Sequence, residues 1–339
     1  MAFFLALTVI QVVLQTQLVY NVNAENGVLR FMVLGDWGGL PFPMFNYSTA
    51  IERGVADGMA RLANKKPQDF VIALGDNFYF TGVENVEDER FFLTYENVFH
   101  DQSLQIPWYV CAGNHDHYGN VSAQIAYTKK SNRWEFPSLF YSKTFAVQGT
   151  STTVQLILID TVLLCGNTAS DQSETPLPGP KFPEMADRQL EWIVHEIRSS
   201  TADYILVGGH YPIYSAGMHG NTQILIDNLT PIFEKYDVTA FLSGHDHNNQ
   251  HIIVNNLNYL VTGCATFAQD WPLKQDELPL GSLHFFWADG KELGGFIAFE
   301  ANESSMNATF MSGTGLELHQ VTMLPRKTKN KSKYKFQEI

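Results

Sequence analysis

Six short apolar runs dominate this chain, and each is rich in β-branched residues. They lie at residues 29–36, 69–76, 107–116, 153–160, 203–210 and 238–247. Runs that are apolar at nearly every position suit strands buried on both faces. Helical periodicity appears between several of them, as in Ile51, Val55, Met59 and Leu62, and again in the segment around residues 190–197. The alternation of strands and helices predicts a largely parallel α/β sheet.

The chain changes character after residue 250. Short runs such as NYLVTG, GGFIAFEA and LELHQVTM are separated by Gly, Asp and Asn, a pattern that predicts antiparallel strands added to the same core. Only residues 166–183 have the Pro, Ser and Gly content of a long exposed loop. We therefore expect one catalytic domain over residues 25–325, followed by a basic, solvated tail over 326–339.

The N-terminus predicts export. Residues 2–14 form a thirteen-residue apolar run, and the Val-Asn-Ala step at 22–24 is typical of a signal-peptide cleavage site, so residues 1–24 are assigned to a signal peptide. The run is short for a membrane span, although the lack of a positive charge before it leaves an uncleaved anchor as the alternative. Six glycosylation sequons agree with export: Asn46, Asn120, Asn228, Asn302, Asn307 and Asn330. We expect a lysosomal or extracellular protein without a stable membrane anchor.

Composition excludes several classes of function. With 45% apolar and 17% charged residues, the 339-residue chain can bury a large core. The net charge of −13 argues against nucleic acid as a partner, because the acidic charge lies on the body and the basic charge on the tail. Three cysteines form no disulfide framework, and we expect Cys111 and Cys264, in apolar segments, to be buried free thiols. We expect a monomer.

Five of the apolar runs end in a potential metal ligand that directly follows a glycine. The ligands are Asp36, Asp76, Asn114 with His115 beside it, His210, and His245 with His247. The carboxyl ends of parallel strands meet at one edge of a sheet, so these side chains should converge. One Gly-Asp is more often an ordinary turn, and one histidine is more often structural. Five such endings together predict a metal site.

This set offers more ligands than one ion takes. A carboxylate such as that of Asp76 can bridge two ions about 3.5 to 4 Å apart. Residues i and i+2 of an extended segment project to the same side, so His245 and His247 can each reach one of two adjacent ions. We therefore expect a dinuclear centre.

The motifs GDWG, GDNFY, GNHD, GGHYP and GHDHN, in this order, resemble those of the purple acid phosphatases, specifically the small tartrate-resistant animal type of the metallophosphoesterase superfamily. The resemblance runs from about residue 29 to about residue 325. It implies an α/β fold of four layers, in which two packed mixed β-sheets carry helices on the outside. It also implies which residues hold the ions. Fe(III) would bind to Asp36, Asp76, Tyr79 and His247, and Fe(II) or Zn(II) to Asp76, Asn114, His210 and His245.

Tyr79 distinguishes this type from other members of the superfamily. Related serine/threonine phosphatases and phosphodiesterases have Asp-x-His at the first motif, whereas here the third position is Gly38. A phenolate is a hard anionic ligand suited to a trivalent ion. The alternative is that Tyr79 only packs within the aromatic run of residues 78–80.

The implied activity is the hydrolysis of phosphate monoesters at acid pH by a metal-bound hydroxide. Asp36, Asp76, the Tyr79 phenolate and the hydroxide offset all but about +1 of a ferric and divalent pair, so the centre should attract phosphate. His115 and His219 match catalytic positions that assist the leaving oxygen, although His219 could be an ordinary surface histidine. As a hypothesis, Asp116 and Asp246 orient the neighbouring imidazoles. The substrates would be small phosphate monoesters or phosphoproteins.

The sequence departs from the family in three places. Cys165 matches half of a mammalian disulfide whose other position is Ile224 here, so we expect that disulfide to be absent. Residues 262–269 (TGCATFAQ) differ from the family's glycine-rich segment at the pocket rim. Residues 166–183 occupy the place of a loop that in mammalian members covers the active site and is cut by proteases.

Two other functions remain open. One is an iron-binding or iron-transport glycoprotein with the same site, which the sequence alone cannot separate from an enzyme. The other is a phosphodiesterase or nucleotide hydrolase that uses two divalent ions, which the missing Asp-x-His disfavours.

Overall fold

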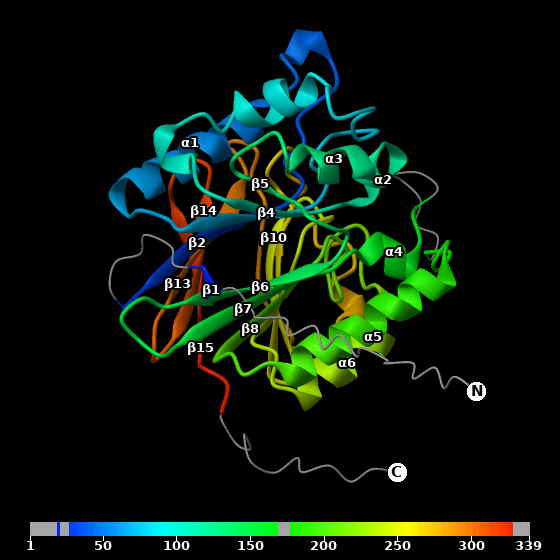
Figure 1. Cartoon of the computed structure of the whole chain (residues 1–339), viewed down its shortest axis with the longest axis vertical. Coiled ribbons are helices and arrows are strands. Elements are labelled where there is room, and N and C mark those ends of the chain that lie inside the picture. The colour runs from blue at the N-terminus through cyan, green and yellow to red at the C-terminus, as the bar shows by residue number, and fades with distance from the viewer. Residues whose placement is uncertain (1–18, 21–26, 169–176, 328–339) are drawn as a thin grey trace, which may run out of the picture.

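The computed structural model describes residues 19–20, 27–168 and 177–327 (Figure 1). Most of the expected signal peptide and nearly all of the basic tail therefore lie outside the described residues, as do Asn330 and the middle of the 166–183 loop. The fold consists of two β-sheets with helices on their outer faces (Figure 1). No helix in the described part of the chain is long and apolar enough to cross a membrane.

The seven-stranded sheet has a parallel half and an antiparallel half. Its order is β15-β14-β13-β2-β3-β4-β5. The parallel half consists of β2 (Leu29–Leu34), β3 (Phe70–Leu74), β4 (Trp108–Cys111) and β5 (Trp134–Glu135). The antiparallel half consists of β13 (Gly295–Ala301), β14 (Met306–Ser312) and β15 (Glu317–Met323). The change to antiparallel strands that the sequence predicts after residue 250 is confirmed for these three strands, whereas the NYLVTG segment, in the other sheet, pairs antiparallel on one side and parallel on the other.

The eight-stranded sheet is also mixed. Its order is β1-β6-β7-β8-β9-β11-β10-β12. The strands are β1 (Val19–Tyr20), β6 (Tyr141–Ala146), β7 (Thr153–Leu158), β8 (Tyr204–Gly208), β9 (Ala240–Ser243), β10 (Asn249–Val254), β11 (Leu257–Thr262) and β12 (Leu283–Trp287). Within it, β7, β8, β9 and β11 run parallel, whereas β10 and β12 pair antiparallel.

The parallel sheet expected from the apolar runs is thus divided in two, with β2–β4 in one sheet and β7–β9 in the other. The apolar pattern could not show this division, because a strand buried on both faces looks the same whether its second face meets a helix or another sheet. The two mixed sheets implied by the family resemblance are confirmed.

The helices cover the two outer faces (Figure 1). Over the seven-stranded sheet lies α1 (Ala50–Lys65), with α2 (Asn114–Tyr118) and α3 (Val121–Tyr127) near its β4–β5 side. Over the eight-stranded sheet lie α4 (Thr161–Cys165), α5 (Pro183–Ser199) and α6 (Gln223–Lys235). A capping box starts α1, because the Thr49 side chain accepts from Glu52 N while the Glu52 carboxylate accepts from Thr49 N. The predicted apolar face of α1 is confirmed, since Val55 and Met59 are fully buried.

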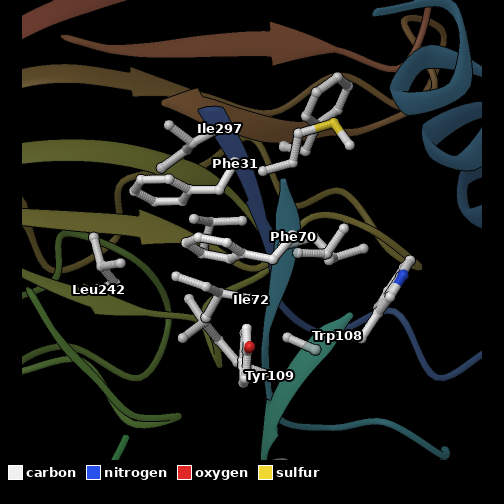
Figure 2. Packing of buried hydrophobic residues seen from close by; sticks show 14 of the residues in the cluster. Phe31, Phe70, Ile72, Trp108, Tyr109, Leu242 and Ile297 are labelled. Carbon is white, nitrogen blue, oxygen red and sulfur yellow. The ribbon is translucent and has the colours of Figure 1, made fainter. Parts of the chain in front are cut away.

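Stacked aromatic rings join the sheets in the core. Phe31 stacks on Phe70 and on Phe299 at 4.8 and 4.7 Å between ring centroids, and Phe70 stacks at 4.1 Å on Phe145 of the other sheet. Figure 2 shows the parallel rings of Phe31 and Phe70. Each such pair contributes about 0.5–1.5 kcal/mol beyond its buried area. The strands that carry the candidate site are therefore held in one core.

The cysteines agree with the sequence-based expectation. Cys111, Cys165 and Cys264 are all buried free thiols, so the expected absence of the Cys165 disulfide is confirmed.

Candidate metal centre

The loops after five parallel strands meet at one place between the two sheets. Asp36, Asp76, His210 and His245 each lie two residues beyond the end of their strand, and Asn114 begins α2 just after β4. The predicted convergence is therefore a feature of the fold.

One group of donors centres on His210. Its Nε2 lies 2.8 Å from Asn114 Oδ1, 3.2 Å from His245 Nδ1 and 3.4 Å from Asp76 Oδ1. Asp76, His210 and His245 are all buried, and each presents a ligand atom within 4.8 Å of the others. Two nitrogens and two oxygens thus surround one small volume.

A second group centres on Tyr79. Its hydroxyl lies 2.9 Å from Asp36 Oδ1 and 3.1 Å from His247 Nε2, which is itself 3.5 Å from Asp36 Oδ1. The seven residues that the sequence singled out as ligands therefore fall into two adjacent groups. Tyr79 faces Asp36 and His247 in this arrangement, so it does more than pack within its aromatic run.

The backbone takes unusual conformations to bring these groups together. Asp36, Asp76 and His245 have φ of 57°, 50° and 70°, a region that residues with side chains seldom occupy. Such conformations cluster at functional sites, where the surrounding structure holds them in place. Gly113 is required for close approach, because a Cβ there would lie 2.1 Å from Asp76 Oδ1.

Hydrogen bonds outside the donor groups fix the imidazole tautomers. His210 Nδ1 lies 2.9 Å from the Leu74 carbonyl, which only accepts, so Nδ1 carries the proton and the Nε2 lone pair faces the centre. His115 is held similarly, with Nδ1 2.6 Å from the Phe80 carbonyl and Nε2 3.9 Å from Asp76 Oδ2. Metal-binding histidines are typically oriented in this way.

Two buried aspartates and the imidazoles beside them determine the electrostatics of the site. Asp36 and Asp76 are at most 1% exposed, and their recorded ion-pair partners in the described residues are imidazoles. Burial raises the pKa of Asp76, but the imidazoles of His210 and His115 outweigh it, so the net pKa is lowered. Burial, followed by the neighbouring imidazoles, holds the pKa of His245 well below its usual value. Burial and the two carboxylates raise the pKa of Tyr79 well above 10.

This chemistry fits bound cations. Two buried carboxylates, an amide oxygen, a phenol and three imidazoles converge, and cations would offset the charge that burial otherwise penalises. The donors near Tyr79 are richer in oxygen, whereas those near His210 are richer in nitrogen.

His219 lies beside the first group, the one centred on His210. Its ring stacks on that of His245 at 4.0 Å between centroids, and its main-chain N donates to Asp246 Oδ1 at 2.9 Å. It is half-buried, so it does not have the environment of an ordinary surface histidine. Burial is the first cause of its lowered pKa, and the Asp246 carboxylate opposes the shift.

The hypothesis for the two aspartates needs correction. The Asp116 carboxylate accepts hydrogen bonds from the main-chain N of Gly113 and Asn77, and Asp246 accepts from the main-chain N of His219 and from the Ser215 hydroxyl. Both therefore hold the loops that carry the donors, and their recorded hydrogen bonds reach main chain, hydroxyl and amide groups instead of imidazole rings. Burial raises the pKa of Asp116 to about 6.

Sequence reasoning missed two residues. The buried Arg90 guanidinium donates to the carbonyls of Tyr79 and Gly38, and so fixes the Tyr79 loop. Phe267 contacts Tyr79 and His247 edge-on or tilted, at 5.1 Å between ring centroids in each pair. Arg90 gave no sequence signal, because it lies outside the strand-end motifs. Phe267 lies in the rim segment that already departs from the family pattern.

Residues 29–249 match the family model for calcineurin-like phosphoesterases. The chain belongs to this family. It is 42% identical to human tartrate-resistant acid phosphatase type 5, over 96% of this chain and 98% of that protein. It is 30% identical to purple acid phosphatase 4 of Arabidopsis thaliana, over 91% of this chain and 87% of that one. The resemblance to the tartrate-resistant type of purple acid phosphatase is thereby confirmed, and the family implies a dinuclear metal centre.

The solved structures support the same fold. GAP50, described as the anchor in the inner membrane complex of Plasmodium, superposes with a TM-score of 0.75 at 23% identity, covering 90% of this chain and 91% of that one. At that identity the likeness shows the architecture alone.

Proposed function

We propose that this calcineurin-like phosphoesterase is an exported acid phosphatase that hydrolyses phosphate monoesters. The observation that carries the proposal is the pair of adjacent donor groups, with the Tyr79 hydroxyl 2.9 Å from Asp36 Oδ1 in one and Asn114, His210 and His245 in the other. A phenol at this position distinguishes an iron-containing phosphatase from relatives that use two divalent ions.

The ligand assignment follows the two groups. Fe(III) would be held by Asp36, Asp76, Tyr79 and His247, and Fe(II) or Zn(II) by Asp76, Asn114, His210 and His245. When bound, such a pair of ions supplies Lewis acidity and activates water for attack on phosphorus. Burial and the two carboxylates raise the pKa of Tyr79, and a trivalent ion would oppose this shift, so binding of the ion would release the phenol proton.

Two histidines would assist the leaving group. The Phe80 carbonyl holds the His115 Nδ1, so the His115 Nε2 would be the atom that donates to a substrate oxygen. His219 stacks on His245 beside the nitrogen-rich group and could orient phosphate there. Each imidazole must be protonated to donate, which favours turnover in acid.

The substrates would be small phosphate monoesters or phosphoproteins. Partial exposure of Phe80 and Phe267 leaves room beside the centre for more than a bare phosphate. The protein would act as a monomer in the secretory pathway, in lysosomes or outside the cell. Among the described sequons, Asn46, Asn120 and Asn228 are exposed and are the favoured glycan sites, whereas Asn302 and Asn307 are half-buried.

The test is a pH–rate profile of the purified glycoprotein on an aryl phosphate, with bound iron counted on the same sample. We expect a maximum in acid and about one to two iron ions per chain, depending on whether the second metal is zinc or iron, with both iron and activity lost in His247→Ala. His195→Ala is the matched control, because His195 is an exposed histidine on α5.

Two outcomes would overturn the proposal. Stoichiometric iron without turnover would favour an iron carrier. Activity confined to neutral pH and dependent on added divalent ions would favour the two-divalent-metal phosphodiesterase or nucleotide hydrolase.

A further inference from the structure

Three histidines that take no part in the proposed function lie together at the edge of the sandwich. His251 is on β10, His284 on β12 and His319 on β15. β12 is one edge strand of the eight-stranded sheet, and β15 is one edge strand of the seven-stranded sheet. The histidine cluster (His251, His284 and His319) therefore bridges the two sheets.

Irregularities in both edge strands accompany the cluster. The β10–β12 register shifts so that His251 pairs with Phe285 and Ile252 with Leu283, which leaves His284 as an extra residue opposite them. The β14–β15 register shifts next to His319, between Phe310 and Met311. β-Bulges of this kind re-aim side chains and are enriched at sheet edges and functional sites.

The hydrogen bonds of His251 fix its tautomer. Its Nε2 lies 3.1 Å from Asn258 Oδ1, and this amide oxygen only accepts, so Nε2 carries the proton. Its Nδ1 therefore holds a lone pair, which faces His319 Nε2 at 3.0 Å. An imidazole oriented through its other nitrogen by an amide oxygen has the arrangement of a metal ligand.

The His319 ring is fixed by stacking and the His284 ring can rotate, which suits both as further metal ligands. Phe285 stacks on His319 at 4.6 Å between centroids and 6° between planes, which fixes the His319 ring. The His284 ring centroid is 5.4 Å from that of His251, and this exposed side chain can rotate. His251 is only 5% exposed, and burial lowers its pKa to about 4, so it stays in the neutral form that metals bind.

We propose that His251, His319 and His284 form a zinc site that is separate from the dinuclear centre and joins the two sheets. Two nitrogen ligands of a tetrahedral zinc ion lie about 3.3 Å apart, close to the 3.0 Å already present between His251 Nδ1 and His319 Nε2. Zinc would take the place of the proton between these nitrogens, and His319 would then carry its one proton at Nδ1, so that its imidazole stays neutral. A rotation of His284 supplies the third nitrogen, and water supplies the fourth ligand.

The test titrates Zn²⁺ into the protein with its dinuclear centre already filled, at pH 7.5. Equilibrium dialysis with elemental analysis should find one additional zinc ion per chain. At a free zinc concentration about 100-fold above Kd, the melting temperature should rise by about 4 °C. Neither the zinc stoichiometry nor the melting temperature depends on phosphatase turnover. The inferred zinc site can therefore be refuted while the proposed function stands, and the proposed function can be refuted while the zinc site stands.

Four variants distinguish zinc binding at this site from nonspecific zinc binding elsewhere on the protein. His319→Phe keeps an aromatic ring against Phe285 and should abolish the additional ion. Asn258→Ala should raise Kd by about 10- to 100-fold through loss of the orienting hydrogen bond. His284→Ala, at an exposed position, should weaken binding without impairing folding. His195→Ala, which removes a remote exposed histidine, should leave Kd unchanged.

The proposal is overturned if the unaltered protein takes up no additional zinc, or if His284→Ala and His319→Phe bind it with the Kd of the His195→Ala control. Zinc binding that is weakened equally by all of these substitutions, the control included, would also overturn it.

Discussion

Gly244 lies in the turn between β9 and His245, and its replacement by alanine tests whether the Asp36 carboxylate must stay where the fold places it. A Cβ at position 244 would lie 2.3 Å from Asp36 Oδ2, whereas real Cβ atoms essentially never approach a heavy atom closer than 3.0 Å. The carboxylate must therefore move by at least 0.7 Å, the difference between these distances. The next contact, Asp36 Cγ at 3.4 Å, is ordinary, so the side chain moves and the backbone can stay.

The magnitude follows from the hydrogen bond that this movement breaks. Asp36 Oδ2 accepts from His245 N at 2.7 Å, and a hydrogen bond to a charged group contributes about 1.5–3 kcal/mol. If the activation free energy rises by the same amount because the proposed metal ligands are displaced, kcat should fall by about 10- to 150-fold. Bound iron should fall as well, because Asp36 would no longer face Tyr79.

The assay compares kcat, iron content and thermal unfolding of Gly244→Ala with those of Gly290→Ala. A Cβ at Gly290 would meet Ile51 Cδ1 at an ordinary 3.8 Å, and both substitutions reduce the entropy of the unfolded chain equally. If Gly244→Ala matched Gly290→Ala in both kcat and iron content, the close approach to Asp36 would not matter and the reasoning would be refuted.

Three further substitutions test a partly buried ion pair outside the site and two residues beside Tyr79. His117→Gln removes the 2.7 Å contact of His117 Nε2 with Asp160 Oδ2. Burial lowers the pKa of His117, but the Asp160 carboxylate outweighs burial, so the net pKa is raised. The contact therefore stabilises the fold below about pH 6.5, and this contribution is lost as the pH rises through the raised pKa. Urea unfolding should show a loss of about 1.5–3 kcal/mol at pH 5 and a smaller loss at pH 8, and an equal loss at both would contradict this assignment. Phe267→Ala should raise KM for an aryl phosphate by about 2- to 10-fold and change KM for an alkyl phosphate less, because only the aryl substrate would stack on the Phe267 ring. Equal changes in KM for the two substrates in steady-state kinetics would count against this role. Arg90→Lys keeps the charge, but a lysine cannot donate to both of the carbonyls that Arg90 joins. We therefore expect kcat to fall about tenfold and the visible absorption of the iron-loaded protein to shift. An unchanged spectrum would show that Arg90 does not position Tyr79.

The sequence by itself determined which strands end in the side chains of the candidate metal centre. Asp36, Asp76 and His210 each follow a glycine at the end of an apolar run, and the polarity of parallel strands brings such ends to one edge of a sheet. Tyr79 came from the resemblance to the purple acid phosphatases, because it accompanies a missing histidine in the first motif. The strand-end motifs are local features, readable without knowing which strands are neighbours.

Only the tertiary structure decided what depends on neighbours far apart in the chain. It divided the parallel strands between two sheets, and it turned Asp116 and Asp246 toward main-chain N–H groups of adjacent loops. His251 and His319 are 68 residues apart in the chain, yet their ring nitrogens lie 3.0 Å apart. That contact requires two sheet edges to meet and two strands to shift register there. Local periodicity carries no information about either, because both follow from how the sheets pack.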